Sequence, residues 1–343
     1  MLVTGGAGYI GSHAAKALHG AGYRVVVYDN FSAGHRGAVK YGELVEGDIA
    51  DVAAVRAALR RHEVSGVMHF AAVLDVGESV REPIRYYRNN VVGALSVLEA
   101  MAAESVRQFV FSSTCATYGE PIETPITETH PQRPINSYGE TKLAVEHALP
   151  HVETAHGIHW VALRYFNAAG ADPDGEIGED HSPEIHLIPR AIEAATGGRG
   201  LQVFGDDYPT PDGTCLRDYV HVTDLADAHV RALEAIVETG KSGAYNLGTG
   251  RPHSVHLGET PAGYPHATHL PRNLRTKHLT MNGIASTAAN RSVFSANPGH
   301  IGRNGSMRWR NNRLALTKRL GIGIAHFHRD GSGVGERDAS CSH

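Results

Sequence analysis

Short runs of apolar, largely β-branched residues alternate with longer amphipathic stretches along the first 250 residues of this 343-residue chain. The apolar runs, such as residues 24–28 and 108–112, have the length of buried strands. The stretches between them repeat their apolar positions every three to four residues, as surface helices do. Strands that alternate with helices form βαβ units. The pattern therefore predicts an α/β fold built on a doubly wound parallel sheet.

The predicted elements can be placed by residue number. Strands are expected at residues 2–4, 24–28, 43–45, 66–71, 108–112 and 159–165, with a last strand at 244–247. Helices are expected near residues 12–20, 51–62, 83–103, 137–156 and 223–238. Residues 167–220 are richer in Gly, Pro and Asp, which is typical of turns and short strands. We expect a sheet domain over 1–166 to which 221–250 return, a smaller lobe over 167–220, and a separate segment 251–343.

The charge of the chain changes sign near residue 250. Residues 1–250 carry 19 Lys and Arg against 32 Asp and Glu, whereas residues 251–343 carry 13 against 4. The second segment also lacks both the 3.6- and the 2-residue apolar period, so we expect a basic tail that is poorly ordered. A basic tail can bind nucleic acid, but this one has no aromatic interleaving and no known module. We therefore expect no nucleic-acid partner.

Composition also bears on compartment and metals. The longest apolar runs are far shorter than the ~18 to 20 residues of a membrane span, and the first strand begins at once, so we expect neither a membrane helix nor a signal peptide. Three widely spaced cysteines, Cys115, Cys215 and Cys341, favour a reducing compartment, the cytoplasm. His326 and His328 lack a neighbouring set of carboxylates or thiolates, so no metal is expected.

A glycine-rich turn follows the first predicted strand and opens a helix. Gly5, Gly8 and Gly11 have the spacing that permits a tight turn, approach to a pyrophosphate and close helix packing. Asp29 ends the second strand, where a carboxylate accepts from both ribose hydroxyls and repels a 2′-phosphate, and Asn30 follows it. The sheet is therefore expected to be an NAD-binding Rossmann fold, with NAD preferred over NADP.

Residues that leave the next two strands are further candidates for cofactor contacts. Asp48 and Ile49 follow the third strand and are placed to approach the adenine; for Asp48, capping of the next helix is the alternative. Phe70, Ala71 and Ala72 leave the fourth strand, and the small alanines allow the backbone to approach a cofactor closely.

Tyr138 and Lys142 stand four residues apart in a predicted helix, so a phenol and an ammonium share one face. A nearby cation favours the phenolate and is expected to lower the pKa of the tyrosine, which would make it a general base. Such pairs also occur by chance as ordinary surface residues. The glycine turn and a hydroxyl-rich strand end at residues 112–114, which includes Thr114, favour the chemical interpretation.

With the glycine fingerprint, Asp29, Thr114 and the Tyr138–Lys142 pair in this order, the chain resembles the extended short-chain dehydrogenase/reductase family. Residues 76–79, 164–171, 186–189 and 204–222 are similar to stretches of its nucleotide-sugar epimerases, and the likeness covers residues 1–250. It implies an NAD-dependent isomerase of galactose metabolism that interconverts UDP-glucose and UDP-galactose, by C4 oxidation, rotation of the 4-keto sugar and re-reduction. It also implies a homodimer formed through the helices at 83–103 and 137–156.

The resemblance assigns roles to individual residues. Tyr138 would be the base, Lys142 would lower its pKa and hold the nicotinamide ribose, and Thr114 would hydrogen-bond the reacting oxygen. Cofactor contacts would fall on Tyr9, Ile10, Asp29, Asp48, Ile49, Phe70, Asn89 and Phe166. Contacts to UDP would fall on Asn167, Leu187, Ile188, Phe204 and Arg217. The guanidinium of Arg217 suits a diphosphate, and an ion pair with Asp218 or Asp224 is its alternative.

The likeness stops at Arg251. The family continues with an amphipathic helix and an Arg-Arg-x-Gly-Asp stretch, and this chain has neither. We interpret residues from 251 onward as a replaced segment or an out-of-frame translation. A nucleotide-sugar dehydratase is an alternative activity, but it would need acidic residues after Thr114, where Cys115 and Ala116 stand. The motifs would also agree with a decarboxylase, a reductase or an inactive NAD-binding product.

Overall fold

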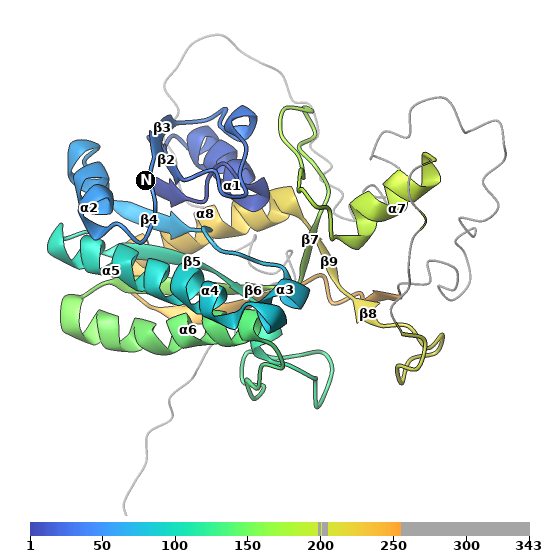
Figure 1. Ribbon diagram of the computed structural model, residues 1–343. Coiled ribbons are helices and arrows are strands. Elements are labelled where there is room, and N and C mark those ends of the chain that lie inside the picture. The colour runs from blue at the N-terminus through green and yellow to red at the C-terminus, as the bar shows by residue number, and fades with distance from the viewer. Residues whose placement is uncertain (198–199, 201–204, 255–343) are drawn as a thin grey trace, which may run out of the picture. The chain divides into compact units, whose positions relative to one another are not determined.

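A seven-stranded parallel sheet forms the centre of the structure (Figure 1). The computed structural model describes residues 1–197, 200 and 205–254, all within the first of the two units into which the chain divides, Met1–Ser292. Across the sheet the strands are β10 (Gly243–Leu247), β6 (His159–Tyr165), β5 (Gln108–Thr114), β4 (Gly66–His69), β1 (Leu2–Thr4), β2 (Val26–Asp29) and β3 (Glu43–Glu46).

The strand order reverses its direction at β1. Residues 2–4 of β1 pair with residues 26–28 of β2 on one side and with residues 67–69 of β4 on the other. The chain adds β2 and β3 in one direction and then β4, β5, β6 and β10 in the opposite direction. Ligands of such sheets bind at the carboxyl ends of the strands, where this order reverses.

Helices cover both faces of the sheet. On one face, α1 (Tyr9–Gly20) packs against α8 (Val222–Thr239), and on the other lie α2 (Val52–Arg61), α5 (Gly93–Ala103) and α6 (Ser137–His156) (Figure 1). Shorter elements are α3 (Val76–Arg81), α4 (Pro83–Tyr86), the π-helical turn η2 (Tyr87–Val92) and the 3₁₀ turns η1 (Arg36–Ala38) and η3 (Cys115–Thr117). Because side chains alternate along a strand, Leu2 joins the core under α5 and Val3 the core under α1 and α8.

A smaller group of elements follows β6. The strand β7 (Asn167–Ala169) pairs in parallel with β9 (Tyr219–His221), and β8 (Leu216–Arg217) pairs antiparallel with β11 (His253–Ser254). Between them lies α7 (Leu187–Ala195). The chain then returns to the sheet through α8 and β10. Regular structure thus extends to Ser254, and the rest of the predicted tail, 255–343, lies outside the described residues.

The predicted fold class is confirmed, and α6 has the predicted bounds. The side chain of Asn136 caps its first turn at the N–H of Gly139, and Gly157 ends it with φ +65°. The single helix predicted over 83–103 was wrong, because η2 interrupts it. In this wider turn the buried Asn90 side chain bonds the backbone of Val73 and the Thr141 hydroxyl.

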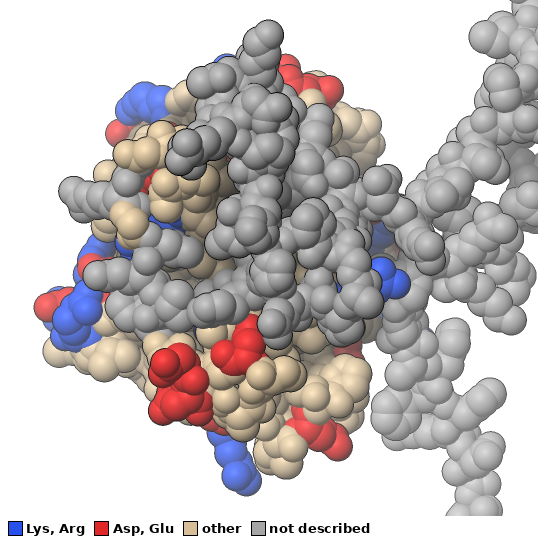
Figure 2. All heavy atoms as spheres, turned by 90° about the vertical axis from the view of Figure 1, so that its right-hand side faces the viewer, with Lys and Arg blue, Asp and Glu red and all other residues tan. Residues whose placement is uncertain are grey.

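Charged side chains are mixed on the surface. On the coloured part of the face shown in Figure 2, Lys and Arg are interspersed with groups of Asp and Glu rather than gathered into one basic area. No helix among the described residues is long and apolar enough to cross a membrane.

Candidate active site

The glycine-rich turn between β1 and α1 is packed so closely that side chains do not fit. A Cβ on Gly5, which has φ +71°, would lie 2.5 Å from the backbone N of Ala71, and one on Gly11 would lie 2.2 Å from the O of Gly5. Gly8 caps α1 and has no side chain to cover the first-turn N–H groups. A helix N-terminus with uncovered N–H groups suits a pyrophosphate. The predicted turn thus fits a dinucleotide.

Asp29 lies beside this turn at the end of β2. The carboxylate is buried and accepts from the N–H of Ala7 (3.0 Å) and of Phe31 (2.8 Å), which fixes its orientation. Arg36, the nearby residue that could have favoured a 2′-phosphate, instead pairs with Glu46 and stacks on Phe31. The local charges therefore agree with NAD.

The chain that follows β3 is hydrogen-bonded to the chain that follows β2. The amide of Asn30 donates to the Asp48 carboxylate (3.2 Å), which also accepts from the N–H of Ala50. Capping was the wrong alternative for Asp48, because Asp51 caps α2 at Ala54. Ile49 is buried, and a Cβ on Gly93 would lie 2.5 Å from its Cδ1.

The chain leaving β4 runs close to the glycine turn. The N–H of Phe70 donates to the O of Thr4, and its ring packs on His229 at 4.7 Å. Ala71 and Ala72 are half-buried. Asn89, also half-buried, donates to the Asn90 side chain. Small side chains thus leave the backbone accessible at the switch point of the sheet.

Tyr138, Lys142 and Thr114 come together where β5 ends and α6 begins. Thr114 is the last residue of β5; its hydroxyl accepts from the N–H of Ala116 (3.2 Å) and lies close enough to Tyr138 to lower its pKa. The Lys142 ammonium nitrogen lies 5.9 Å from the centre of the Tyr138 ring. It donates to the Ser112 carbonyl at 2.8 Å. The predicted base, lysine and hydroxyl are therefore neighbours.

The protonation of this group differs from what the sequence predicts. Burial raises the pKa of Tyr138, and the nearby Thr114 hydroxyl opposes this only in part. Burial also lowers the pKa of Lys142 to about 7, against the opposite influence of Glu146. The net direction of the pKa of Tyr138 is therefore upward, opposite to the fall that the Tyr138–Lys142 spacing predicts. Desolvation of the phenolate outweighs the partly charged lysine.

Two supporting groups were missed from the sequence. The Tyr165 hydroxyl lies 2.6 Å from the Ser112 hydroxyl, and its proximity raises the pKa of Tyr138 further. Behind them, Arg164 and Glu146 form a buried ion pair at 2.5 Å. Glu146 also accepts from Ser113, next to Thr114. One available signal was the spacing of Lys142 and Glu146, which places both on one helical face.

The predicted substrate residues lie on the smaller elements. Asn167 is in β7, and its amide donates to the Asp218 carbonyl at 2.9 Å. Leu187 and Ile188 begin α7 and are half-buried, and Phe166 packs near Gly248. Phe204 lies outside the described residues.

Arg217 in β8 is exposed and forms no ion pair with any described residue. The carboxylate of Asp218 instead accepts from Thr249 and the N–H of Gly250, so the alternative pairing of Arg217 is not observed. Arg217 is close enough to Cys115 to lower its pKa against the effect of burial, which raises it to about 11. Its positive charge is therefore close to the end of β5.

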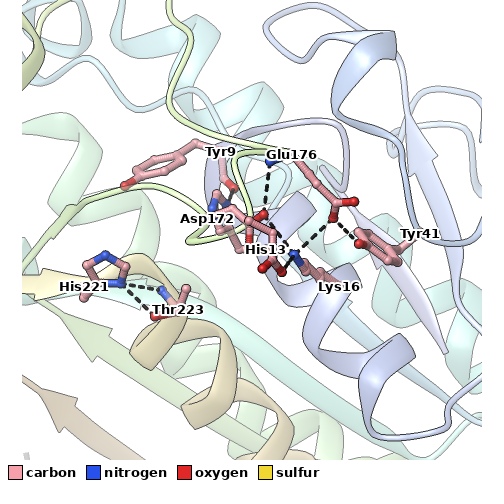
Figure 3. Close-up of polar contacts among 9 residues, drawn as sticks. Tyr9, His13, Lys16, Tyr41, Asp172, Glu176, His221 and Thr223 are labelled. Carbon is pink, nitrogen blue, oxygen red and sulfur yellow. Dashed lines mark hydrogen bonds and ion pairs between the residues drawn. The ribbon is translucent and has the colours of Figure 1, made fainter. Parts of the chain in front are cut away.

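The segment after β7 is fastened to α1. Figure 3 shows Lys16 reaching from α1 to Asp172 (2.8 Å) and Glu176 (3.1 Å), and Asp174 is equally close at 2.7 Å. The hydroxyl of Tyr9 donates to the Gly170 carbonyl at 2.5 Å. A pocket of about 200 Å³ lies between this segment and the glycine turn, lined in part by Gly8, Tyr9, His35, Gly178 and His181. Ile10 is half-buried on the same turn of α1.

Comparisons with known proteins agree with this geometry. Residues 1–248 match the NAD dependent epimerase/dehydratase family. The chain is 57% identical over 256 residues to the UDP-glucose 4-epimerase of Rhizobium leguminosarum bv. trifolii, covering 74% of this chain and 78% of that protein. It is also similar to that of Corynebacterium glutamicum, with 52% identity over 257 residues, covering 74% and 77%.

Solved structures give the same result. The UDP-glucose 4-epimerase of Brucella ovis, in complex with NAD, is 57% identical with a TM-score of 0.72, over 74% of this chain and 78% of that one. That of Bifidobacterium longum, in complex with NAD⁺ and UDP, is 40% identical with a TM-score of 0.69, over 74% and 79%. The family match ends within a few residues of the predicted departure at Arg251. The chain belongs to the NAD dependent epimerase/dehydratase family.

Proposed function

We propose that this protein is a UDP-glucose 4-epimerase, an isomerase of galactose metabolism that interconverts UDP-glucose and UDP-galactose with NAD as its cofactor. The observation that carries the proposal is the convergence of Tyr138, Thr114 and Lys142 at the switch-point edge of the sheet. Relatives that bear this name share 50–57% identity with the chain, and the likeness includes this edge.

The proposed cofactor site runs along the carboxyl ends of β1, β2 and β4. Gly5, Gly8 and Gly11 would admit the pyrophosphate to the N-terminus of α1, and Asp29 would accept from the adenosine ribose. Other proposed contacts are Tyr9, Ile10, Asn30, Asp48, Ile49, Phe70, Ala71, Ala72, Asn89 and Phe166. When bound, NAD⁺ supplies the hydride acceptor and a positive charge on its nicotinamide ring.

In the proposed reaction, Tyr138 as phenolate takes the proton from the 4-hydroxyl of the sugar while C4 is oxidised. Thr114, which lies beside Tyr138, would hydrogen-bond the same oxygen. After the 4-keto sugar has turned its other face, Tyr138 returns the proton to the oxygen as C4 is reduced. The product differs from the substrate only in configuration at C4, so no net oxidation occurs.

Lys142 and Tyr165 are proposed to position this chemistry. With its pKa lowered to about 7, Lys142 carries its charge in only part of the molecules at neutral pH. Its ammonium donates a hydrogen bond to the Ser112 carbonyl and lies 5.9 Å from the centre of the Tyr138 ring. In the molecules in which Lys142 is charged, this proximity favours the phenolate of Tyr138. Lys142 would also hold the nicotinamide ribose.

The UDP moiety is proposed to lie across the smaller elements. Arg217 has a guanidinium without an ion-pair partner among the described residues, and a diphosphate would satisfy it in a bidentate manner. Asn167 keeps its amide oxygen, since its nitrogen donates to Asp218. Leu187, Ile188 and Phe204 are proposed to complete the site. This assigns residues 167–220 to a substrate lobe beside an NAD domain of 1–166 and 221–250.

We also propose a homodimer formed through the helices α3 to α6. Large apolar side chains are exposed on α3, α4 and η2, where Val80 is 64%, Ile84 67% and Val92 51% exposed. Apolar groups of this size on one surface favour a partner. Light scattering after size exclusion tests this: Ile84→Glu should give monomers, whereas Ile122→Glu, at a loop residue 70% exposed, should not. A wild-type chain that stays monomeric throughout would reject the dimer.

The cytoplasm is the proposed compartment. The described cysteines, Cys115 and Cys215, are both free thiols, which suits a reducing environment. Fractionation of cells that express the full chain would check this.

Activity is tested by incubating the purified protein with UDP-galactose and measuring UDP-glucose. Conversion without added NAD is expected, together with fluorescence of bound reduced cofactor. Tyr138→Phe should lower kcat at least ~100-fold, the scale of lost proton transfer, and leave the fold intact. Tyr245→Phe, at a tyrosine 38% exposed on β10, is the matched control and should keep full activity.

Three outcomes would speak for a different activity or a different base. Bound NAD without conversion would mean that the protein is an inactive member of the family. Release of water from the sugar would indicate a dehydratase. Full activity of the Tyr138→Phe variant would reject the proposed base.

A further inference from the structure

Four side chains between β7 and α7 form a second cluster that the proposed reaction does not use. Glu179, His181, Glu184 and His186 each direct one ligand atom to a common point, and these atoms all lie within 4.8 Å of one another. The Nδ1 of His186 is 2.8 Å from Glu179 and 3.1 Å from Glu184, and the Nδ1 of His181 is 3.4 Å and 3.8 Å from the same two carboxylates.

These distances suit a tetrahedral ion. Zinc binds imidazole nitrogen and carboxylate oxygen at about 2.0 to 2.2 Å, so neighbouring ligands of a tetrahedral site lie about 3.3 to 3.5 Å apart. The four histidine–glutamate distances run from 2.8 to 3.8 Å, with Glu184 using Oε1 toward His186 and Oε2 toward His181, and one ligand atom from each of the four residues lies within 4.8 Å of the others. Two imidazoles with two carboxylates also favour zinc over magnesium or calcium, which prefer oxygen ligands.

The charges at the cluster call for a cation. Glu179 and Glu184 bring two carboxylates to side chains only 8% and 20% exposed, and the side chains that face them are the imidazoles of His181 and His186. No Lys or Arg pairs with either glutamate among the described residues. The neighbouring acidic group on 172–176 differs, because Lys16 supplies its cation (Figure 3). That second group is therefore already neutralised by the protein.

A buried histidine nitrogen without a hydrogen bond also supports a cation at this cluster. The Nδ1 of His181 is buried and makes no hydrogen bond within the described structure, although it faces both carboxylates. Buried polar atoms of proteins are nearly always satisfied, so this nitrogen has a lone pair or proton with no partner. Glu184 is held in place by the N–H groups of Ile185 and His186, both at 2.8 Å. Such outer contacts orient metal ligands.

We propose that Glu179, His181, Glu184 and His186 bind one divalent transition metal of the zinc type as a structural site. All four positions are protein ligands, so no position is left for a substrate. On binding, the Nδ1 of His186 would turn its lone pair to the metal in place of its present contacts with the two carboxylates, and the single proton of the neutral ring would sit on Nε2.

The site would fix the segment that borders the cofactor pocket. The ring of Tyr9, in the glycine turn, packs edge-on against that of His181 at 6.4 Å. The carbonyl of Asp180 lies 3.2 Å from the Nε2 of His35, across the same pocket. Leu187 follows His186 directly and begins α7. Metal binding would therefore hold one wall of the pocket and the start of α7 together.

The prediction of no metal rests on the histidine pair of the tail, His326 and His328, and does not extend to this loop. The four ligands stand within eight residues, at 179, 181, 184 and 186, with a proline at 183 that breaks any helical pattern. Only the folded loop brings alternating Glu and His to one point.

The test measures metal bound by the purified full-length chain. The protein is stripped with a chelator, dialysed against zinc and analysed by elemental mass spectrometry, beside the variant His181→Ala/His186→Ala. The control is His147→Ala/His151→Ala, which removes two histidines of α6 that lie outside the cluster. The wild type and the control should bind about one zinc more per chain than the ligand variant. Because histidines of the tail can bind zinc too, the difference between variants is the measurement.

Two further readings give the proposal a clear outcome. Cobalt should give the visible absorption of a tetrahedral site in the wild type and lose it in the ligand variant. Zinc should raise the unfolding temperature of the wild type and control only. If the double variant does not fold, Glu184→Gln replaces it, and zinc affinity should fall beyond the ~10- to 100-fold that loss of an outer contact costs. Equal zinc content in wild type and ligand variant, or no saturable zinc binding by the wild type, would overturn the proposal.

Discussion

Removing one member of the buried Arg164–Glu146 pair is expected to be among the most destabilising single substitutions in the sheet unit. Their side chains are 8% and 4% exposed, and the guanidinium donates to both carboxylate oxygens at 2.5 to 3.1 Å. It also donates to Tyr118 (2.8 Å) and Gln132 (3.2 Å). The pair joins β6 to α6, the helix that carries Tyr138.

The expected cost follows from what each substitution leaves behind. In Arg164→Met the Glu146 carboxylate keeps only the Ser113 hydroxyl and the Gln132 amide as donors. Removing one member of a buried pair costs ~3 to 5 kcal/mol, because the other charge stays without its partner. Replacing both, in Arg164→Met/Glu146→Leu, leaves no buried charge of the pair and should cost less than the single substitution.

Urea denaturation followed by circular dichroism measures these free energies of unfolding. The single variant should lose more stability than the double variant, which gives a favourable coupling energy in the mutant cycle. A surface pair, Arg231 with Asp227 on α8, is the matched control and should show a coupling below ~1 kcal/mol. If Arg164→Met loses less than ~1 kcal/mol, or if the double variant is less stable than the sum of the singles, the pair is not the buried contact described above.

Three other predictions concern the turn, a buried histidine and the base. Gly11→Ala should lower NAD affinity at least ~10-fold, measured by fluorescence of the bound cofactor, because its Cβ would lie 2.2 Å from the Gly5 carbonyl oxygen. The control Gly20→Ala, whose Cβ would have nothing within 4 Å, should keep the wild-type affinity. Equal affinities of the two variants would contradict the prediction. Burial lowers the pKa of His229 to about 4, so the unfolded chain takes up a proton at this histidine before the folded chain does as pH falls below 6.5. Between pH 6.5 and 4.5 the wild type should therefore lose about 2 to 3 kcal/mol more free energy of unfolding than His229→Leu. Equal losses in the two proteins would refute this prediction. In the cofactor-free protein, ultraviolet titration against Tyr138→Phe should place the pKa of Tyr138 above that of free tyrosine, and ionisation near neutral pH would disprove the effect of burial.

Local signals explain what the sequence could predict. Asn136 and Gly157 bound α6 through interactions within a few residues, and the glycine spacing of the first turn reflects contacts made inside one βα unit. The Arg164–Glu146 pair and the Tyr165–Ser112 contact join residues 18 and 53 positions apart, so no short pattern contains them. The direction of the pKa of Tyr138 depends on how deeply the fold buries it. A spacing rule gives proximity of a cation but not the cost of desolvation.

The cost of desolvating the phenolate changes how Tyr138 must act as a base. Burial raises the pKa of Tyr138 and lowers that of Lys142 to about 7, so the two groups together do not supply a stable phenolate at neutral pH. The phenolate would need a further positive charge beside it, and the oxidised nicotinamide ring carries one. Reduction of the ring would remove that charge and favour the neutral phenol of Tyr138, which suits uptake of the 4-hydroxyl proton in the same step, and reoxidation of the ring would favour its return. Proton removal and oxidation of C4 would then depend on each other, because neither the base nor the acceptor is effective without its partner.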